Sequence, residues 1–175
     1  MSEKNDYIIE MHGIQKSFGG VKALRNIDLQ VKRGSCHALL GENGAGKSTL
    51  MKVLTGIIAK DSGKILLNGE EVQIQSLRHA EELGIAIVPQ ELSFISYFTV
   101  AENIFLGREP MGAFGVNKSK MSADAQKMLD RFDLGIDADS LIADLSIAQQ
   151  QMVEIVKAIS FNCRILVMDE PTSSI

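Results

Sequence analysis

Residues 41–49 of this chain are Gly41-Glu42-Asn43-Gly44-Ala45-Gly46-Lys47-Ser48-Thr49, and they are the strongest indication of its fold. It fits the phosphate-binding pattern G-x-x-x-x-G-K-[ST] at every fixed position. Its glycines allow the backbone to curl until several N–H groups point at one spot, and the N-terminus of a following helix adds positive partial charge there. We therefore expect the loop to bind a nucleoside triphosphate, with Lys47 on the outer phosphates and the Ser48 hydroxyl on Mg²⁺.

The residues on either side of the loop predict the strand and the helix that this pattern requires. Ser35 to Leu40 is an apolar run that leads straight into the loop, and we expect His37 within it to be a core residue. After the loop, four apolar residues recur at the spacing i, i+3, i+4, i+7, which predicts a helix over residues 47–55. These four are Leu50, Val53, Leu54 and Ile57.

The rest of the chain alternates between strand and helix patterns. Asn68-Gly69 is a strong hairpin signal between two strand patterns, and Ser76 and Thr99 have the sequence context of helix N-caps. Residues 111–118 hold two glycines and predict a loop. Besides the strand over Ser35 to Leu40, the expected strands are Tyr7 to Met11, Ile27 to Val31, Lys64 to Leu67, Glu71 to Ile74, Ile85 to Val88 and Arg164 to Met168. This order predicts an α/β fold, with a mostly parallel sheet, an N-terminal antiparallel β region and a helical insert.

Composition narrows the class of protein. The 175 residues are 45% hydrophobic and 23% charged, as in a soluble globular domain, and the net charge is −4. Because nucleic-acid surfaces concentrate Lys and Arg, we expect no nucleic-acid partner. Cys36 and Cys163 each lie in an apolar run, which predicts buried thiols and a reducing compartment. No apolar run approaches the ~20 residues of a membrane span.

A second chemical motif follows the last expected strand. Ile165-Leu166-Val167-Met168 ends in Asp169-Glu170, and ligands bind beyond the carboxyl ends of parallel strands. Asp169 would hold Mg²⁺, directly or through water, and Glu170 would act as general base on an attacking water. Alone, two acids after a strand indicate no more than a charged turn; together with the phosphate loop they indicate a catalytic site.

A third motif, Leu145-Ser146-Ile147-Ala148-Gln149, predicts an N-cap serine that opens a helix. Such an N-terminus can also bind phosphate. The order and spacing of the motifs resemble those of the nucleotide-binding domain of ABC transporters over nearly the whole chain. The motifs that carry this resemblance are residues 41–49, Gln90, residues 145–149 and residues 165–170.

The resemblance implies roles for further residues. Gln90 would contact Mg²⁺, take part in catalysis with Lys47 and Glu170, and link the site to the helical insert. Phe18 would stack on adenine, with Val21 beside the nucleotide; the alternative for Phe18 is a core phenylalanine near a turn. Ser146 would contact the γ-phosphate bound to another domain. The implied cofactors are ATP and Mg²⁺.

The third motif departs from the family's usual Leu-Ser-Gly-Gly-Gln, because Ile147 and Ala148 replace both glycines. This puts in doubt the close backbone approach that glycine permits. The form of this motif, with Thr99-Val100-Ala101-Glu102-Asn103-Ile104, resembles the ATPases of bacterial importers for ribose, galactose and xylose. The implied partners are a second ATPase domain, transmembrane permease subunits and, indirectly, a periplasmic sugar-binding protein, at the cytoplasmic face of the inner membrane.

The family also places a histidine after the catalytic glutamate, whereas His12, His37 and His79 all precede Asp169. We therefore expect one ATPase domain that lacks its C-terminal part, with a nucleotide-binding core over 1–90 and 156–175 and a helical subdomain over 91–155. Two alternatives to a transport ATPase stay open. One is an ABC-type ATPase that acts on nucleic acid, and the other is a nucleotide-binding module without turnover.

Overall fold

The computed structural model describes residues 6–90 and 92–169. It divides the chain into two compact units, residues 1–83 and 84–175, which are described separately. Across the described residues, we find no helix with the length and apolar character needed to cross a membrane.

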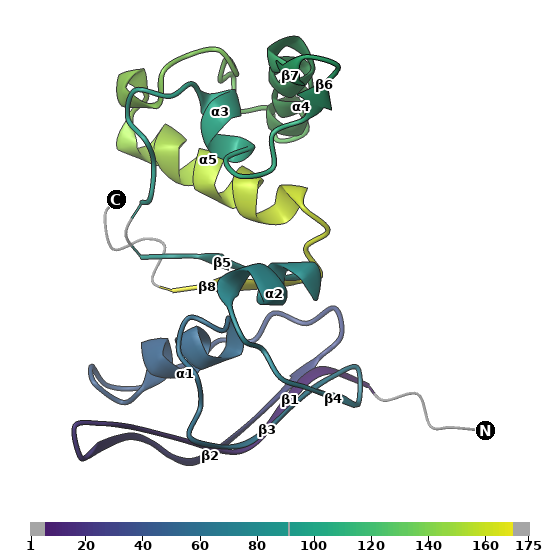
Figure 1. The fold of residues 1–175 in the computed structure, drawn as a ribbon. Helices are drawn as coiled ribbons and strands as arrows, with labels where there is room; N and C mark the ends of the chain where they lie inside the picture. Colours follow the sequence, from purple (N-terminus) through teal and green to yellow (C-terminus); the bar gives the residue numbers. More distant parts are fainter. Residues whose placement is uncertain (1–5, 91, 170–175) are drawn as a thin grey trace. The chain divides into compact units, whose positions relative to one another are not determined.

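The first unit is built on an antiparallel sheet with the strand order β2-β1-β3-β4 (Figure 1). The strands are β1 (Tyr7–Phe18), β2 (Val21–Lys32), β3 (Ser62–Leu67) and β4 (Glu70–Val72). Asn68 and Gly69 both have positive φ, 54° and 85°, as a type I′ hairpin turn requires. The predicted hairpin and the N-terminal antiparallel region are therefore confirmed.

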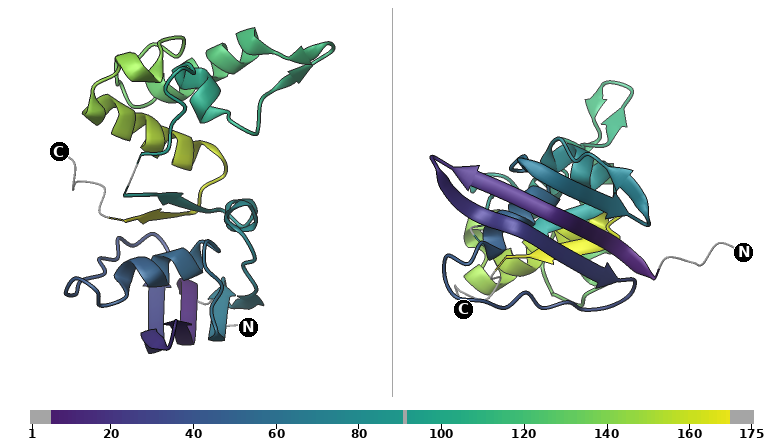
Figure 2. Two further views of the ribbon diagram at one scale, coloured as in Figure 1. Left: turned by 60° about the vertical axis from the view of Figure 1, so that its left-hand side comes forward. Right: turned by 90° about the horizontal axis from the view of Figure 1, so that it is seen from below.

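Two helices accompany this sheet. Helix α1 (Lys47–Leu54) buries Leu50, Val53 and Leu54, so its apolar stripe faces the core as the helical spacing predicts. In Figure 2 it covers one face of the sheet, whose strands contribute buried Ile9, Met11 and Ile14. Helix α2 (Leu77–Glu82) begins at Ser76, whose hydroxyl accepts a hydrogen bond from the His79 N–H.

Strands β1 and β2 are longer than the sequence predicts. Each has 12 residues and they pair from Tyr7↔Lys32 to Phe18↔Val21, with four shifts of register. Such shifts insert unpaired residues and break the alternation of apolar and polar side chains. The predicted strands, Tyr7 to Met11 and Ile27 to Val31, therefore cover only the end of this pair that lies away from its turn.

The strand predicted over residues 35–40 is wrong for this structure. The segment has no regular secondary structure, Leu40 is 89% exposed, and Cys36 and His37 are exposed. The expectations of a buried Cys36 and a core His37 are therefore also wrong. A strand exists only where a neighbour pairs with it, and none of the described strands pairs with this segment. Cys163, the other thiol, is half-buried, and desolvation raises its pKa.

The second unit contains a parallel strand pair, β5 (Ile85–Val88) and β8 (Ile165–Met168). The pair is in register from Ile85↔Ile165 to Val88↔Met168, and the two strands run side by side in Figure 1. Both strands lie where the sequence predicts them, although about 75 residues separate them in the chain.

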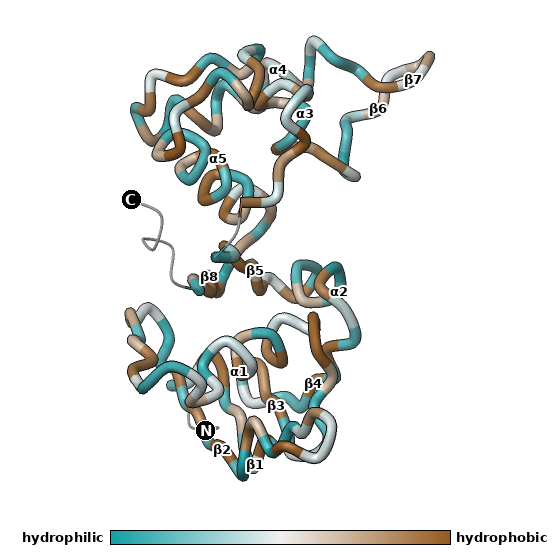
Figure 3. The backbone as a smooth tube through the Cα atoms, turned by 90° about the vertical axis from the view of Figure 1, so that its left-hand side faces the viewer, coloured by the Kyte–Doolittle hydropathy of each residue, from teal (hydrophilic) through white to brown (hydrophobic). Residues whose placement is uncertain are grey.

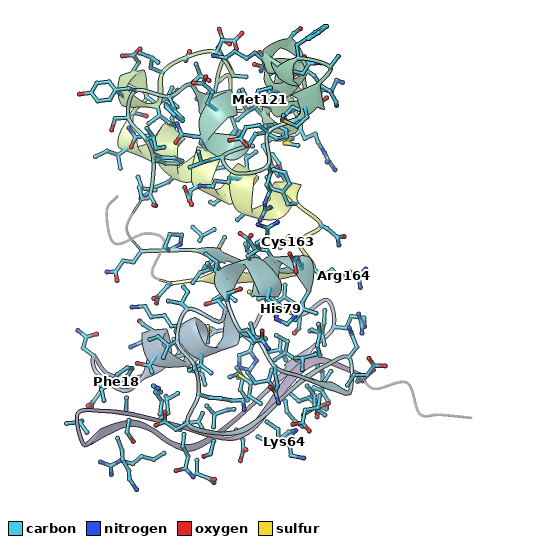
Figure 4. All side chains as sticks on the ribbon, viewed as in Figure 1. Phe18, Lys64, His79, Met121, Cys163 and Arg164 are labelled. Carbon is cyan, nitrogen blue, oxygen red and sulfur yellow. The ribbon has the colours of Figure 1, made fainter. Side chains whose placement is uncertain are left out.

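The described helices of this unit are α3 (Val100–Ile104), α4 (Lys118–Asp130), the short 3₁₀ turn η1 (Ile142–Asp144) and α5 (Ile147–Ser160). They pack around one apolar cluster, and Met121, labelled in Figure 4, is one of its members. The cluster includes Val100, Ile104, Met121, Leu129, Val153 and Val156. A helical region in this part of the chain is confirmed.

The loop predicted over residues 111–118 is instead a short hairpin followed by the start of α4. Strands β6 (Met111–Gly112) and β7 (Gly115–Val116) pair antiparallel with two residues each. Figure 3 shows the apolar tip of this hairpin, and Phe114 there is fully exposed. Strands of two residues leave too short an alternation for a sequence pattern to mark them.

Candidate functional site

The phosphate loop ends at the N-terminus of α1, and this N-terminus has no side-chain cap. Among the described α-helices it is alone in this, because each of the others begins with a residue whose side chain accepts a backbone hydrogen bond. The capping residues are Ser76, Thr99, Asn117 and Ser146. The first N–H groups of a helix have no partner inside it, so the start of α1 offers donors to an external anion.

The residue at this position is Gly46, and the backbone there requires glycine. Its φ is 93°, in the left-handed region. A Cβ on Gly46 would lie 2.7 Å from the Ala23 carbonyl oxygen and 2.9 Å from Leu24 Cδ2, both on β2. The loop therefore enters the helix in close contact with β2, which fixes the position of its N–H groups.

Lys47 follows at the first position of α1. Its Nζ donates hydrogen bonds to the carbonyl oxygens of Gly41 and Glu42, at 2.9 and 3.0 Å. The ammonium group is thus folded back over the loop, with the Ala45 N–H donating to Glu42 O at 3.1 Å beneath it. A lysine ammonium group held beside a helix N-terminus that has no side-chain cap suits the phosphates of a nucleotide.

Phe18 and Val21 lie at the turn end of the β1–β2 pair (Figure 4). They are 46% and 70% exposed, so Phe18 is not a core residue. Lys16 Nζ lies 5.4 Å from the centroid of the Phe18 ring. An exposed aromatic ring can stack on a base, and its role in adenine binding stays a prediction.

The sequence did not indicate how Lys16 is held beside that ring. Lys16 Nζ forms an ion pair with Asp61 at 2.8 Å, and the same carboxylate accepts a hydrogen bond from the Ser17 N–H at 2.7 Å. These hydrogen bonds, that of Lys16 first, lower the pKa of Asp61. The two partners are more than 40 residues apart in the chain, so no local pattern could reveal the pair.

In the second unit, Gln90 and Asp169 follow the carboxyl ends of β5 and β8. The Asp169 N–H donates to Val88 O at 3.2 Å, which continues the parallel pairing by one residue. Both residues therefore follow the same edge of this strand pair, which is where ligands of parallel strands bind. A carboxylate and an amide at one edge are oxygen ligands of the kind Mg²⁺ accepts.

Ser146 begins α5 with a reciprocal capping box, as the motif predicts. Its Oγ accepts from the Gln149 N–H at 3.3 Å, and Gln149 Oε1 accepts from both the Ser146 N–H at 3.0 Å and Oγ at 2.9 Å. Ile147 is 58% exposed and Ala148 is exposed. Neither has positive φ, so the helix start tolerates the absence of glycine here.

The proposed general base, Glu170, lies outside the described residues. The phosphate loop and Phe18 belong to the first unit, whereas Gln90, Ser146 and Asp169 belong to the second. Each group of residues is thus assembled within its own unit. Their roles as site residues stay predictions.

Comparisons with known proteins agree with these features. A family model described as "ABC transporter" matches residues 24–173. A protein of Geobacillus kaustophilus named for the import of ribose, galactose and methyl galactoside is 52% identical over 100% of this chain, which covers 35% of that relative. A galactose/methyl galactoside import ATP-binding protein of Yersinia pestis is 48% identical over 99% of this chain and 34% of its own length. The chain spans about a third of the length of the curated relatives it matches.

Solved structures give the same result for the fold. A nucleotide-free ATP-binding cassette from an ABC transporter matches with a TM-score of 0.79 and 25% identity, over 97% of this chain and 71% of that one. An ATP-binding cassette of an ABC transporter in its ADP conformation matches with a TM-score of 0.78 and 28% identity, over 97% and 70%. The predicted α/β fold of a phosphate-loop NTPase is confirmed, and the chain belongs to the ABC transporter family.

Proposed function

We propose that this chain is an ATP-binding domain of the subunit that energises sugar import by an ABC transporter. The observation that carries the proposal is the N-terminus of α1, which lacks a side-chain cap and begins at Gly46 beside Lys47. An uncapped helix N-terminus under a lysine favours the charge of a triphosphate. The names of the relatives, ATP-binding proteins for import of galactose and methyl galactoside, support the transport role.

Within this proposal the residues have distinct tasks. The N–H groups at the N-terminus of α1 hold the phosphates, and Lys47 compensates the charge of the outer ones. Ser48, Asp169 and Gln90 are the residues that would hold Mg²⁺, which when bound neutralises charge on the phosphate oxygens. The Ser146 helix of a second ATPase domain approaches the outer phosphate, once Ser146 Oγ is released from Gln149.

In hydrolysis, Glu170 accepts a proton from water as the water oxygen bonds to the terminal phosphorus. The bond from that phosphorus to the bridging oxygen breaks, and ADP and phosphate leave. Most of the acceleration comes from fixed positive charge around the transferring group, so Lys47 is central to it. The reaction is expected at the cytoplasmic face of the inner membrane, where permease subunits receive the motion of Gln90 and of the helical subdomain.

A Mg²⁺-dependent ATPase assay on the natural full-length protein tests the catalytic part, with Glu170→Gln as the matched variant. We expect phosphate release that requires Mg²⁺ and that the variant reduces strongly, because an amide cannot accept the proton. ATP binding should persist in the variant, since the phosphate loop is unchanged. Equal phosphate release from both forms would contradict the role of Glu170.

The transport part is tested by uptake of labelled galactose and ribose in cells that carry the natural protein or its Lys47→Ala form. Uptake of one of these sugars with the natural protein, and its loss in the variant, supports sugar import. Uptake that is the same in cells with and without the gene contradicts this part of the proposal. The assignment of Phe18 and Val21 to adenine is tested by the affinity of Phe18→Ala for ATP relative to inorganic triphosphate.

A further inference from the structure

One buried carboxylate in the second unit has no part in the proposed chemistry. Glu154 lies in the middle of α5 and is 5% exposed. Its Oε2 is the one buried side-chain oxygen or nitrogen among the described residues that has no hydrogen-bond partner. Desolvation raises the pKa of Glu154, against the opposing effect of Lys157. Because a buried carboxyl group is costly, its presence inside a helical core calls for a role.

The charged partner of Glu154 is Lys157, one helical turn further along α5. Lys157 Nζ lies 3.8 Å from Glu154 Oε1, and the side chains are 27% and 7% exposed, respectively. The same Nζ lies 5.8 Å from the centroid of the Phe94 ring, within the range of a cation–π contact. Lys157 therefore connects a carboxylate on α5 to an aromatic side chain in the segment that follows Gln90.

Phe94 is partly buried against the apolar cluster of the helices, and the residues just after it are fixed from the other side by Asn103 on α3. The Asn103 side chain is buried and accepts from the Ile95 N–H at 2.9 Å, while its amide donates to Ile95 O, Phe98 O and Thr99 O at 3.0–3.3 Å. Residues 95–99 are thus attached to α3, and Phe94 is attached to α5 through Lys157.

Phe94 follows Gln90 by four residues in the chain. Four residues span at most roughly 14 Å when fully extended, and the Gln90 end is set by β5, which closes at Val88. The position of Phe94 therefore limits Gln90 to within that distance. The same helix that carries Glu154 and Lys157 begins at Ser146.

We propose that Glu154 is a positioning residue, which acts through Lys157 and Phe94 to hold the Gln90 segment against the helix that begins at Ser146. The buried carboxylate fixes the direction of the Lys157 side chain, and the ammonium group holds the Phe94 ring. Movement of Gln90 then requires movement of α5. This role rests on the proposed function of Gln90, but the contacts themselves do not.

The first test needs no ATP. Amide hydrogen exchange of residues 92–98 is measured in the nucleotide-free natural protein and in Glu154→Gln and Lys157→Met, which remove one charge each and nearly keep the volume. We expect exchange there to accelerate by roughly 2- to 30-fold. Lys157→Arg keeps a cation that stacks on aromatic rings and should restore the natural rate.

The matched control is Asp124→Asn on α4. Asp124 and Lys127 form an acid–base pair with the same i, i+3 spacing, at 3.5 Å, but Lys127 is 76% exposed. This variant should leave exchange over residues 92–98 unchanged. Acceleration in the control as large as in Glu154→Gln, or unchanged exchange in both Glu154→Gln and Lys157→Met, overturns the proposal.

The second test separates positioning from stability. In Glu154→Gln we expect kcat for ATP hydrolysis to fall while KM for ATP stays unchanged, because the phosphate loop is untouched, and we expect the same fall in kcat at temperatures well below the thermal midpoint of the variant. Phe94→Leu should have the same effect, and the double variant should be no worse than either one. Independent, additive effects on kcat overturn the proposal.

The two proposals fail in different ways. Suppose that hydrogen exchange over residues 92–98 is faster in Glu154→Gln and that the natural protein hydrolyses no ATP. This result would leave the positioning role intact and refute the proposed function. Normal ATP hydrolysis with unaltered exchange and unaltered kcat in Glu154→Gln would refute the positioning role alone.

Discussion

The helices α1 and α5 begin with motifs that both suit phosphate, yet only the N-terminus of α5 has a side-chain cap. At α1, Gly46 supplies no side-chain cap and the first turn has no acidic residue. At α5, Ser146 and Gln149 satisfy each other through a closed capping box. The first N-terminus has donors available to a ligand, whereas the second one has used part of its donors within the helix.

The two helix N-termini are therefore suited to different tasks. A glycine at the N-cap stabilises a helix less than a serine does, and it leaves the first N–H groups available to an anion. A serine there stabilises the helix and must be released before it can serve another domain. We therefore expect α1 to bind phosphate without a partner and α5 to contribute only when a second domain is close.

The largest effect that separates the two helices is expected for Lys47→Ala. ATP affinity should fall by roughly 10- to 150-fold, the loss of a charge-assisted hydrogen bond worth about 1.5–3 kcal/mol. Isothermal titration with ATP measures it. Lys52→Ala, an exposed lysine in the last turn of the same helix, should leave the affinity unchanged. Equal affinities for Lys47→Ala and the natural protein would refute the role of the loop.

The next effect concerns the glycine that keeps α1 uncapped. Gly46→Ala should lower the free energy of unfolding by more than the ~1–3 kcal/mol of a left-handed non-glycine residue, because its Cβ also meets Ala23 O at 2.7 Å. Gly44→Ala is the matched control, since its φ is 82° but no atom lies within 4 Å of its Cβ. Urea unfolding should show the smaller loss for Gly44→Ala, and equal losses would contradict the close contact with β2.

Removal of the side-chain cap of α5 should have a smaller effect, and it should change stability rather than ATP affinity. Ser146→Ala should cost about 1 kcal/mol of stability with ATP affinity unchanged, because the bound phosphates lie on the other helix. Urea unfolding and titration with ATP measure the two quantities on one sample. A fall in ATP affinity as large as that of Lys47→Ala would contradict the expectation that the phosphates lie on α1 and not on α5.

The smallest expected effect concerns the capping box of α3, which unlike that of α5 contains a carboxyl group. In α3 the box contains Glu102, whose pKa is lowered first by the Thr99 N–H and further by Lys118. A carboxyl group whose pKa is lower in the folded state stabilises the fold above its unfolded pKa, and this contribution is lost as the pH falls through the folded pKa. In α5 the equivalent residue is Gln149, which does not titrate.

Glu102→Gln should therefore remove part of the acid sensitivity, so that the stability difference from the natural protein is largest near pH 7 and shrinks below about pH 4, towards the lowered folded pKa. Gln149→Ala should lower the free energy of unfolding by the same amount near pH 7 and below about pH 4. A difference for Glu102→Gln that does not change with pH would contradict the ionised capping box.

The sequence predicted well what depends on neighbouring residues. The caps at Ser76, Thr99 and Ser146 and the turn at Asn68-Gly69 were predicted because a cap or a turn is decided within four residues. The loop of residues 41–49 was predicted for the same reason. The place of Asp169 at the carboxyl end of its strand followed from the rule for ligand sites of parallel strands.

Features that depend on distant partners could not be predicted. The apolar run of residues 35–40 has the composition of a strand, but composition does not supply the neighbour that a strand needs. The pair of Lys16 and Asp61 joins two strand regions, and the buried carboxyl of Glu154 lies in a helix that its pattern predicts only as an apolar stripe. In each case the chain fold, rather than a local pattern, decides the contact.

The central claim is that the phosphates lie on the N-terminus of α1 and not on that of α5. Backbone amide resonances test it most directly, with inorganic triphosphate as the added ligand. We predict large shifts for the amides of residues 44–49 and none for residues 147–149 in the isolated protein. Shifts at residues 147–149 with none at residues 44–49 would contradict the claim.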